Sequence, residues 1–224
     1  MTFTPPKNTG FVTGLMAEAA HLECVSSSAF CSGGHPGRAA EGAQQLVDMG
    51  AKGLVSFGIC GGLDPSLAPG SLIVATMVIT PEGEKIMTDT AWRNHIMELT
   101  PGPLTIAGIA GSDHAVTSLQ AKGDLFVATG AAAVDMESHV VARVAIKTGV
   151  PFLVLRAIAD PAYRAVPVSA MGGLGPYGHT RILPVLVNLL LRPWELPGLL
   201  RLGRDMQKGL RALRRVADSG LSFS

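Results

Sequence analysis

An almost wholly apolar run, Phe152 to Ala159, restricts the possible folds of this chain more than any other feature. Before it, the segment from Ala131 to Lys147 has a helix-forming composition, and Gly149 supplies a C-terminal stop. An apolar run that follows such a helix is typical of a strand buried on both faces in a parallel sheet. Asp160 comes directly after the run, so we expect its carboxylate at the sheet edge where α/β proteins bind ligands.

Strand-like and helical segments alternate along the rest of the chain. The expected strands are Gly10–Met16, Cys24–Phe30, Gly53–Phe57, Leu72–Ile79 and Leu104–Ala110, and a helix is expected over Pro36–Met49. This alternation predicts an α/β fold with a central, mostly parallel mixed sheet flanked by helices. With 224 residues, 47% of them hydrophobic, and no repeat or linker, the chain is expected to form one domain over residues 1–224.

Charge and cysteine content exclude several classes of protein. The formal net charge of +1 argues against a surface that tracks nucleic-acid phosphates. Cys24, Cys31 and Cys60 lack metal-ligand spacing and are expected to be reduced thiols, so no metal or other cofactor is predicted. The N-terminus lacks a signal-peptide pattern, and the apolar run Ile182–Leu191 is about half as long as a membrane span. A cytoplasmic protein is the simplest expectation.

Three glycines, Gly58, Gly61 and Gly62, follow the expected strand at Gly53–Phe57. Glycine allows positive φ and a close approach of the backbone to a ligand, so this segment is a candidate substrate-binding turn. A tight strand exit is the alternative, since glycine clusters after strands are common. The spacing differs from that of a dinucleotide-binding loop, which disfavours a dinucleotide cofactor.

Four motifs, taken in this order, resemble one family of enzymes. They are GLMAEA near the N-terminus, GLVSFGICGGLDPSLAPGSLIV in the middle, and AVDMES followed by VLRAIAD. From Phe11 to about Asp160 the chain is similar to the superfamily of purine nucleoside phosphorylases and methylthioadenosine/adenosylhomocysteine nucleosidases. Within it, the segments GGHPGRAA and DPAYRAVP and the C-terminal tail look most like the hopanoid-associated phosphorylase branch, which removes adenine from adenosylhopane in bacterial hopanoid synthesis.

The chemistry of this reaction matches two carboxylates of the chain. Breaking a ribosyl–purine bond develops positive charge on the sugar and negative charge on the leaving base. Glu137 can accept hydrogen bonds from the ribose hydroxyls, Met136 can form an apolar floor for the sugar, and Asp160 can protonate the base. The resemblance assigns these three residues the same roles.

Each assignment has a structural alternative. Glu137 could be a solvated acid at a helix N-terminus, and Asp160 an ordinary turn residue before a proline. Arg156 inside the apolar run needs an anionic or carbonyl partner if it is buried, which fits structural pairing and support of the site equally. His139 is expected on another face of the helix, toward solvent or an interface.

The attacking nucleophile is either water or phosphate. In the hydrolytic branch of the family a glutamate at the first strand exit holds the water, and Glu18 is the corresponding residue here. For phosphate, the glycine-rich loop with Gly34 and Arg38 offers a helix N-terminus and a cation, although an exposed loop is the alternative. The branch resemblance and this loop favour phosphate. Ile59 and Ala159 stand where the family often carries hydroxyl residues, which weakens the assignment.

Recognition of the base rests on the resemblance. Ser112 and Asp113 fall where the family contacts the base, and the backbone of Phe152 and Val154 could read the edge of adenine. The stacking aromatic of the family is missing from this loop. His114 or Phe126 is the candidate replacement.

The C-terminal segment 193–217 is predicted to form a basic amphipathic helix. Its apolar residues share one stripe, while Arg201, Arg204, Lys208 and Arg211 crowd the remaining surface. Such a helix can make peripheral contact with the inner face of an anionic membrane. Packing on the sheet or across a dimer is the structural alternative.

Two other functions compete with cleavage of adenosylhopane. One is a nucleosidase for a soluble substrate such as methylthioadenosine or adenosylhomocysteine, and the other is a non-catalytic nucleoside-binding or membrane-surface protein. The partners we expect are a nucleoside, either free or lipid-linked, and a second copy of the chain in a homodimer.

Overall fold

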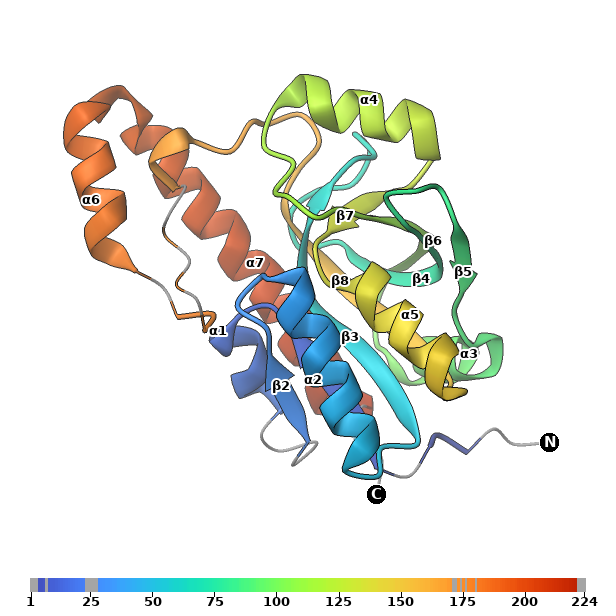
Figure 1. Cartoon of the computed structure of the whole chain (residues 1–224). Helices are drawn as coiled ribbons and strands as arrows, with labels where there is room; N and C mark the ends of the chain where they lie inside the picture. Colours follow the sequence, from blue (N-terminus) through green and yellow to red (C-terminus); the bar gives the residue numbers. More distant parts are fainter. Residues whose placement is uncertain are drawn as a thin grey trace.

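A computed structural model describes residues 4–6, 8–22, 28–170, 173, 175, 177–179 and 181–220 of the chain (Figure 1). The strands in this part are β1 (Thr9–Thr13), β2 (Ala29–Cys31), β3 (Gly53–Gly62), β4 (Leu72–Ile79), β5 (Lys85–Met87), β6 (Leu104–Gly111), β7 (Ala133–Asp135) and β8 (Phe152–Asp160). The α-helices are α1 (Met16–Ala19), α2 (Pro36–Asp48), α3 (Thr90–Leu99), α4 (Leu119–Thr129), α5 (Ser138–Thr148), α6 (Ile182–Leu191) and α7 (Leu196–Gly220). Short 3₁₀ turns are η1 (Ala20–Leu22), η2 (Val168–Ala170) and η3 (Pro193–Glu195).

The strands form one mixed sheet that closes on itself. Strand β3 pairs with β8 in parallel, β8 with β4 in antiparallel, and β4 with β6 and β6 with β7 in parallel. The circuit closes because β7 also pairs with β3, in antiparallel orientation. Strands β1 and β2 extend the sheet beyond β3, and β5 extends it beyond β4. The predicted mixed α/β architecture is therefore confirmed, and closure gathers the carboxyl ends of β3 and β8.

The apolar run behaves as predicted and forms the centre of the sheet. Strand β8 is buried from Phe152 to Ala159, with Asp160 as its last, partly exposed residue. It aligns with β3 from the pair Leu54 and Phe152 to the pair Gly61 and Asp160. Strand β3 pairs with it along its length and β4 pairs with Leu155 to Ala157, while helices cover its two faces, so nearly every position is apolar.

The helix predicted over Ala131–Lys147 is wrong in its first part. Ala133–Asp135 forms β7, and the helix begins only at Ser138. Alanine favours a helix, but here pairing with β6 and with Gly61 and Gly62 of β3 overrides that local preference.

The glycine segment is also not the predicted turn. Strand β3 continues to Gly62, and none of Gly58, Gly61 and Gly62 has a positive φ. The early strands are shorter than predicted, since β1 ends at Thr13 and β2 begins at Ala29. Cys24 and its neighbours in that prediction lie outside the described residues.

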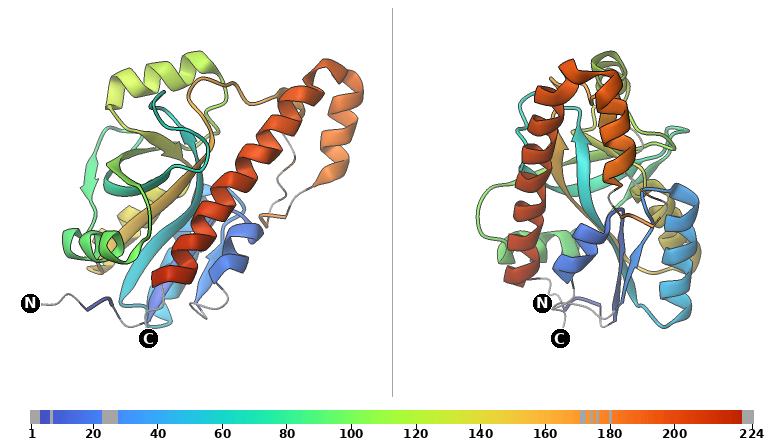
Figure 2. Two further views of the ribbon diagram at one scale, coloured as in Figure 1. Left: turned by 180° about the vertical axis from the view of Figure 1, so that it is seen from behind. Right: turned by 90° about the vertical axis from the view of Figure 1, so that its left-hand side faces the viewer.

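Helices cover the sheet on two sides (Figures 1 and 2). On one side, α2 and α5 pack against each other and share a core with β8. On the other side, α3 and the second half of α7 bury Trp92, Ile96, Leu213 and Val216 against Leu155. Each of these four helices therefore buries one apolar stripe in the core.

The second half of α7 belongs to the core, whereas α6 stands away from the sheet beside the first turns of α7 (Figure 2). The segment predicted as one helix over 193–217 begins as η3 and continues as α7 to Gly220. Ala212, Leu213 and Val216 are buried at its far end. This half is therefore not a free membrane-binding helix, and the structural alternative of packing on the sheet applies to it.

The core position of α7 can be tested with two matched substitutions in the same helix. Leu213 is completely buried and Leu200 is 55% exposed. Leu213→Ala is expected to lower the free energy of unfolding by about 2–5 kcal/mol, because it removes buried methyl groups and leaves a cavity. Leu200→Ala is expected to change it by no more than about 0.5 kcal/mol. Urea unfolding measures both, and equal effects would contradict the described packing.

Candidate active site

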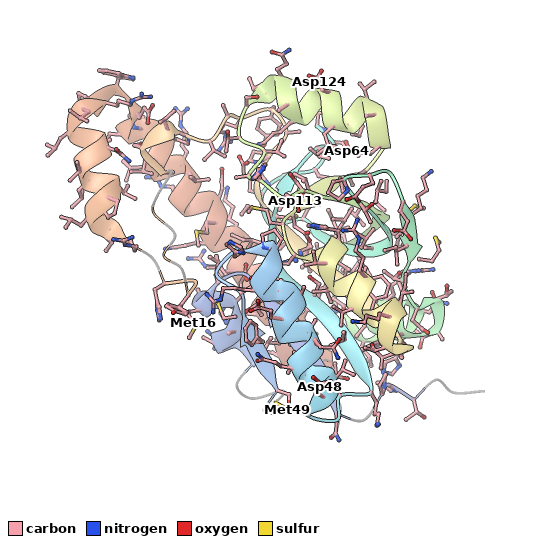
Figure 3. The ribbon with its side chains drawn as sticks, in the orientation of Figure 1. Met16, Asp48, Met49, Asp64, Asp113 and Asp124 are labelled. Carbon is pink, nitrogen blue, oxygen red and sulfur yellow. The ribbon has the colours of Figure 1, made fainter. Side chains whose placement is uncertain are left out.

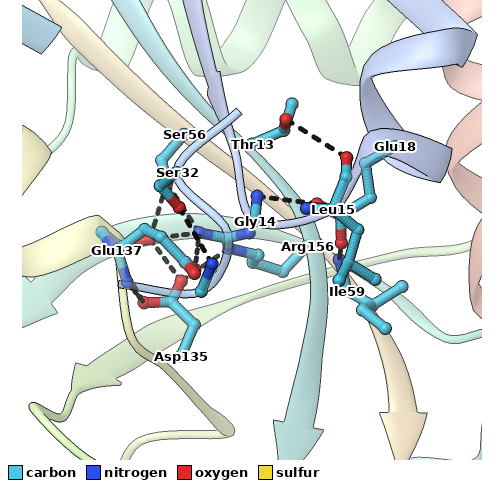
Figure 4. Close-up of polar contacts among 12 residues, drawn as sticks. Thr13, Gly14, Leu15, Glu18, Ser32, Ser56, Ile59, Asp135, Glu137 and Arg156 are labelled. Carbon is cyan, nitrogen blue, oxygen red and sulfur yellow. Dashed lines mark hydrogen bonds and ion pairs between the residues drawn. The ribbon is translucent and has the colours of Figure 1, made fainter. Parts of the chain in front are cut away.

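A buried arginine organises the polar residues of the site (Figure 4). Arg156, in the middle of β8, is fully buried. Its Nε lies 2.5 Å from Asp135 Oδ2, and its Nη2 lies 3.2 Å from Glu137 Oε2. Nη2 also donates to Ser56 Oγ at 2.7 Å. A guanidinium in an apolar strand is tolerated only with such partners, and here the pairing also supports a residue predicted for the site.

Asp135 links this arginine to the start of α5. Its Oδ1 accepts the backbone N–H groups of Glu137 at 3.2 Å and of Ser138 at 2.9 Å. Glu137 therefore directly precedes the helix, rather than lying in its first turns as predicted. Sequence reasoning gave Asp135 no role, although it lies inside the AVDMES motif. The sequence feature that could have indicated Asp135 was Arg156, because a buried arginine that already pairs with Glu137 needs a second carboxylate.

Glu18 is held from two strands at once. Its Oε2 accepts the backbone N–H groups of Gly14 and Leu15, both at 2.8 Å, and its Oε1 accepts that of Ile59 at 2.8 Å. The first two follow β1 and the third belongs to β3. These three bonds fix the direction of a carboxylate that is almost completely buried.

Glu18 and Glu137 lie close to each other at the exit of β1. A Cβ atom on Gly14 would lie 2.9 Å from Glu137 Oε1 and 3.6 Å from Glu18 Oε2, so only glycine fits beside the two acids. Burial raises the pKa of both carboxyl groups, and the positive charge of Arg156 opposes that rise. The pKa values of these two acids are therefore higher than those of exposed glutamates.

Asp160 has a different partner, which the sequence did not reveal. Lys122 of α4 is buried, and its Nζ lies 2.7 Å from Asp160 Oδ2. The same ammonium donates to the backbone carbonyls of Pro161 at 3.0 Å and Arg164 at 2.8 Å. Three acceptors match its three N–H groups. Burial raises the pKa of Asp160, while the hydrogen bond and charge of Lys122 lower it.

These acids face a cavity of about 560 Å³. Glu18, Glu137 and Asp160 line it together with Met136 and Gly61. Two helices add apolar residues to the lining, namely Ile182 and Val185 of α6 and Leu199, Leu202 and Met206 of α7. The volume is within the range of small-molecule sites. Among the described residues, no group of three His, Cys, Asp or Glu side chains could hold a metal ion.

Gly58 and Gly62 act through close packing rather than as an anion-binding turn. A Cβ atom on Gly58 would lie 2.5 Å from Arg156 Nη1 and 2.7 Å from both carboxylate oxygens of Glu18. One on Gly62 would lie 3.2 Å from the backbone nitrogen of Ala162. Glycine at 58 therefore leaves room for both the arginine and the glutamate.

Several predicted base-binding residues are not brought to this cavity. Phe152 is at the opposite end of β8 from Asp160, where its carbonyl accepts the N–H of Asp89, so the proposed contact of its backbone with adenine is wrong. Ser112 and Asp113 also lie outside the lining, although His114 is part of it. Phe126, the other stacking candidate, packs against the cluster around Leu63.

The prediction for His139 is wrong. Its side chain is fully buried, and its Nε2 lies 3.2 Å from Asp113 Oδ1. The close approach of Gly111, where a Cβ atom would lie 2.4 Å from the Cβ of His139, leaves this imidazole no path to solvent. The imidazole therefore lies between its own helix, α5, and strand β6.

Only part of the predicted phosphate-binding loop reaches the cavity. Gly34 lines the cavity, but Arg38 does not. Its guanidinium lies over the ring of Tyr177, 4.4 Å from the centroid, and Nη2 donates to Cys31 O at 3.5 Å. An arginine in this position holds the loop and the chain around Tyr177 together.

Comparison with known proteins places these features in a wider context. A family model described as the phosphorylase superfamily matches residues 11–171. Solved structures of the same fold include the 5′-methylthioadenosine/S-adenosyl homocysteine nucleosidase of Helicobacter pylori, with a TM-score of 0.69 and 19% identity over 94% of this chain and 97% of that one. A comparison with curated proteins found no match.

Two further solved structures share the fold at lower coverage. The S-adenosylhomocysteine nucleosidase of Streptococcus pyogenes, in complex with 5-methylthiotubericidin, has a TM-score of 0.64 and 19% identity over 69% of this chain and 84% of that one. The futalosine hydrolase of Helicobacter pylori has a TM-score of 0.61 and 22% identity over 68% and 87%.

The packing beneath the cavity predicts opposite effects for two glycine substitutions. Gly58→Ala would place a methyl group against Arg156 and Glu18, so the variant is expected to lose about 1–3 kcal/mol of stability. Gly123→Ala lies in α4 with nothing within 4 Å and is expected to gain about 0.5–1 kcal/mol. Chemical unfolding measures both. A neutral Gly58→Ala would show that the arginine and the glutamate are free to move apart.

Proposed function

Because the chain belongs to the phosphorylase superfamily, whose family model matches residues 11–171, we propose that it cleaves the N-glycosidic bond of an adenine nucleoside with a large apolar 5′ substituent. The chain is thus an enzyme of the nucleoside phosphorylase and nucleosidase class. The observation that carries the finer proposal is the mixed lining of the cavity, which combines three acids with apolar residues of α6 and α7. Adenosylhopane, suggested by the sequence resemblance, has such a substituent.

Asp160 is the proposed general acid that protonates the leaving base. Lys122 binds Oδ2, so Oδ1 is the oxygen left to carry the proton. Burial favours the protonated form, and the ammonium limits how far the pKa rises. Lys122 also orients the carboxyl group. The preceding residue, Ala159, has no hydroxyl group that could do so.

Glu137 is the proposed partner of the ribose hydroxyls. Its position is set by Arg156 on one side and by Asp135, which accepts its backbone N–H, on the other. As the sugar gains positive charge, a carboxylate held in this way stabilises it without first reorganising. Met136, also in the lining, provides an apolar surface for the sugar.

The charges at the polar end favour water over phosphate as the nucleophile. Glu18 and Glu137 together would repel a phosphate dianion, and Arg38 lies outside the lining. A carboxylate has about four acceptor positions, and backbone N–H groups use three on Glu18, so one remains for the hydrogen of a water molecule. We therefore propose hydrolysis, in place of the phosphorolysis that the loop sequence suggested.

A nucleosidase for a soluble substrate is the second candidate. The polar end of the cavity would serve methylthioadenosine or adenosylhomocysteine equally well, and solved structures of the same fold are nucleosidases for such compounds. The two candidates differ in the use of the apolar wall, since a small 5′ substituent leaves most of it uncovered.

One experiment separates these possibilities. The purified full-length protein is incubated with adenosylhopane and with methylthioadenosine, each with and without phosphate, and the products are identified by mass spectrometry. We expect adenine and a free sugar from adenosylhopane regardless of phosphate. A sugar 1-phosphate would overturn hydrolysis, a preference for methylthioadenosine would favour the soluble substrate, and binding without turnover would indicate a non-catalytic protein.

The pH dependence of turnover tests the pairing of Lys122 with Asp160. Lys122→Gln keeps hydrogen-bond donors but removes the positive charge that lowers the pKa of Asp160. Because Asp160 acts in its protonated form, the alkaline limb of kcat/KM is expected to move to higher pH. Lys122→Arg keeps the charge and is expected to leave the limb in place.

The control for this experiment is the acid itself. Asp160→Asn is expected to lower turnover at least about a hundredfold, with an unchanged circular dichroism spectrum. An alkaline limb that stays in place in a folded Lys122→Gln variant would show that the limb belongs to another group. Near-normal turnover by Asp160→Asn would exclude Asp160 as the acid.

A further inference from the structure

We propose that one face of α6, continued by Trp194 of η3, docks the protein on an anionic lipid bilayer. This α6 surface consists of Leu183, Leu186, Val187, Leu190, Leu191 and Trp194, all of which are exposed. The inference does not require the proposed reaction. If that reaction also holds, the surface explains how a substrate with an apolar substituent reaches the cavity.

The α6 surface has the spacing of a core-facing stripe but faces solvent. Its residues recur at intervals of three and four, the pattern by which helices usually bury one side. Leu183, Leu190 and Trp194 are 74%, 82% and 73% exposed, and no residue of α6 is buried. Side chains on the outer side of α6 project away from the rest of the molecule (Figure 3). A contiguous apolar surface of this kind marks a site of interaction.

The other side of α6 is part of the cavity wall. Ile182 and Val185 line the cavity, and the helix otherwise packs against η2 and η3. The helix therefore separates the apolar end of the cavity from the outside. An apolar group that leaves a bilayer bound to the α6 surface would have only this single helix to pass before it met the lining of the cavity.

Charge complementarity selects an anionic bilayer as the occupant. Residues 181–204 contain four arginines, Arg181, Arg192, Arg201 and Arg204, and one acid, Glu195. All four arginines are exposed, whereas Glu195 accepts the N–H of Ser169 and pairs with Arg192 at 3.6 Å. The segment that carries the α6 surface thus combines an apolar stripe with exposed arginines, and tryptophan prefers the lipid–water boundary.

A second copy of the chain fits the same surface less well. A twofold contact through α6 would bring together two copies of residues 181–204, whose net charge is positive, and like charges would then oppose association. Anionic headgroups meet no such repulsion.

The length of α6 fits a position along the membrane surface. Ten residues span about 15 Å, about half of the hydrocarbon core. Among the described residues, no single helix is long and apolar enough to cross a membrane, and the chain bends by 117° between α6 and the helix that follows. The α6 surface would therefore lie in the interface, with the sheet and its site above it.

Co-sedimentation with vesicles tests this proposal on the full-length protein. Vesicles of phosphatidylcholine alone and of phosphatidylcholine with phosphatidylglycerol are compared at low and high salt. We expect binding to the anionic vesicles that weakens with salt. Leu183→Gln/Leu190→Gln is expected to reduce the partition coefficient about tenfold or more, because two apolar side chains no longer enter the lipid.

The matched control removes two exposed apolar side chains elsewhere. Met49 and Val127 are 80% and 87% exposed, and Met49→Gln/Val127→Gln is expected to bind vesicles like the unaltered protein. Neither pair lines the cavity, so both variants should keep their turnover of a soluble nucleoside. If no nucleoside is cleaved, the proposed function fails, but the vesicle result still decides the docking surface.

Three results would overturn the proposal. They are no binding of the unaltered protein to anionic vesicles, equal binding by the α6 variant, and an equal loss of binding in the control variant. Sedimentation velocity adds a fourth: a dimer that Leu183→Gln/Leu190→Gln converts to monomer would assign the α6 surface to contact between copies of the chain.

Discussion

The ion pair between Arg156 and Asp135 is the interaction on which the site depends. A guanidinium in the middle of a fully buried strand is unfavourable unless anions surround it, and Asp135 meets it at 2.5 Å. The same aspartate accepts the N–H groups that begin α5, so the pairing of two strands also sets the position of Glu137. Gly58 completes the arrangement because any side chain there would separate the arginine from Glu18. The contacts between the strands therefore also set the geometry of the acids.

The cavity places its acids in two different electrostatic environments. Glu18 and Glu137 share the field of Arg156, whereas Asp160 is paired with Lys122 from the other side of the site. Carboxyl groups with distinct partners can hold distinct protonation states at one pH, as cleavage of a glycosidic bond requires. Most of the remaining lining is apolar, so the cavity combines buried charges with a largely apolar surface.

Helices α6 and α7 show that an apolar stripe in a sequence does not indicate whether the core will cover it. The stripe of α7 is buried on the sheet around Leu213 and Val216, while that of α6 is exposed around Leu183 and Leu190. Both patterns satisfy the same periodicity. The sequence suggested a membrane-binding helix in the basic segment 193–217, yet the structure packs the second half of that segment in the core and exposes the uncharged helix before it. The turn at η3 decides which stripe meets the core.

The sequence by itself determined the α/β class and the buried strand at Phe152–Ala159, and it singled out Glu18, Glu137 and Asp160, which the structure brings to one cavity, because these features rest on local periodicity and short motifs. Only the tertiary structure decided the roles of residues whose partners are distant in the chain. Lys122 reaches a carbonyl 39 residues away at Pro161, β7 forms where alanines favour a helix, and Phe152 and Arg38 lie outside the site they were expected to join. Burial of a charge and pairing of strands are properties of the folded surroundings, and no local pattern encodes them.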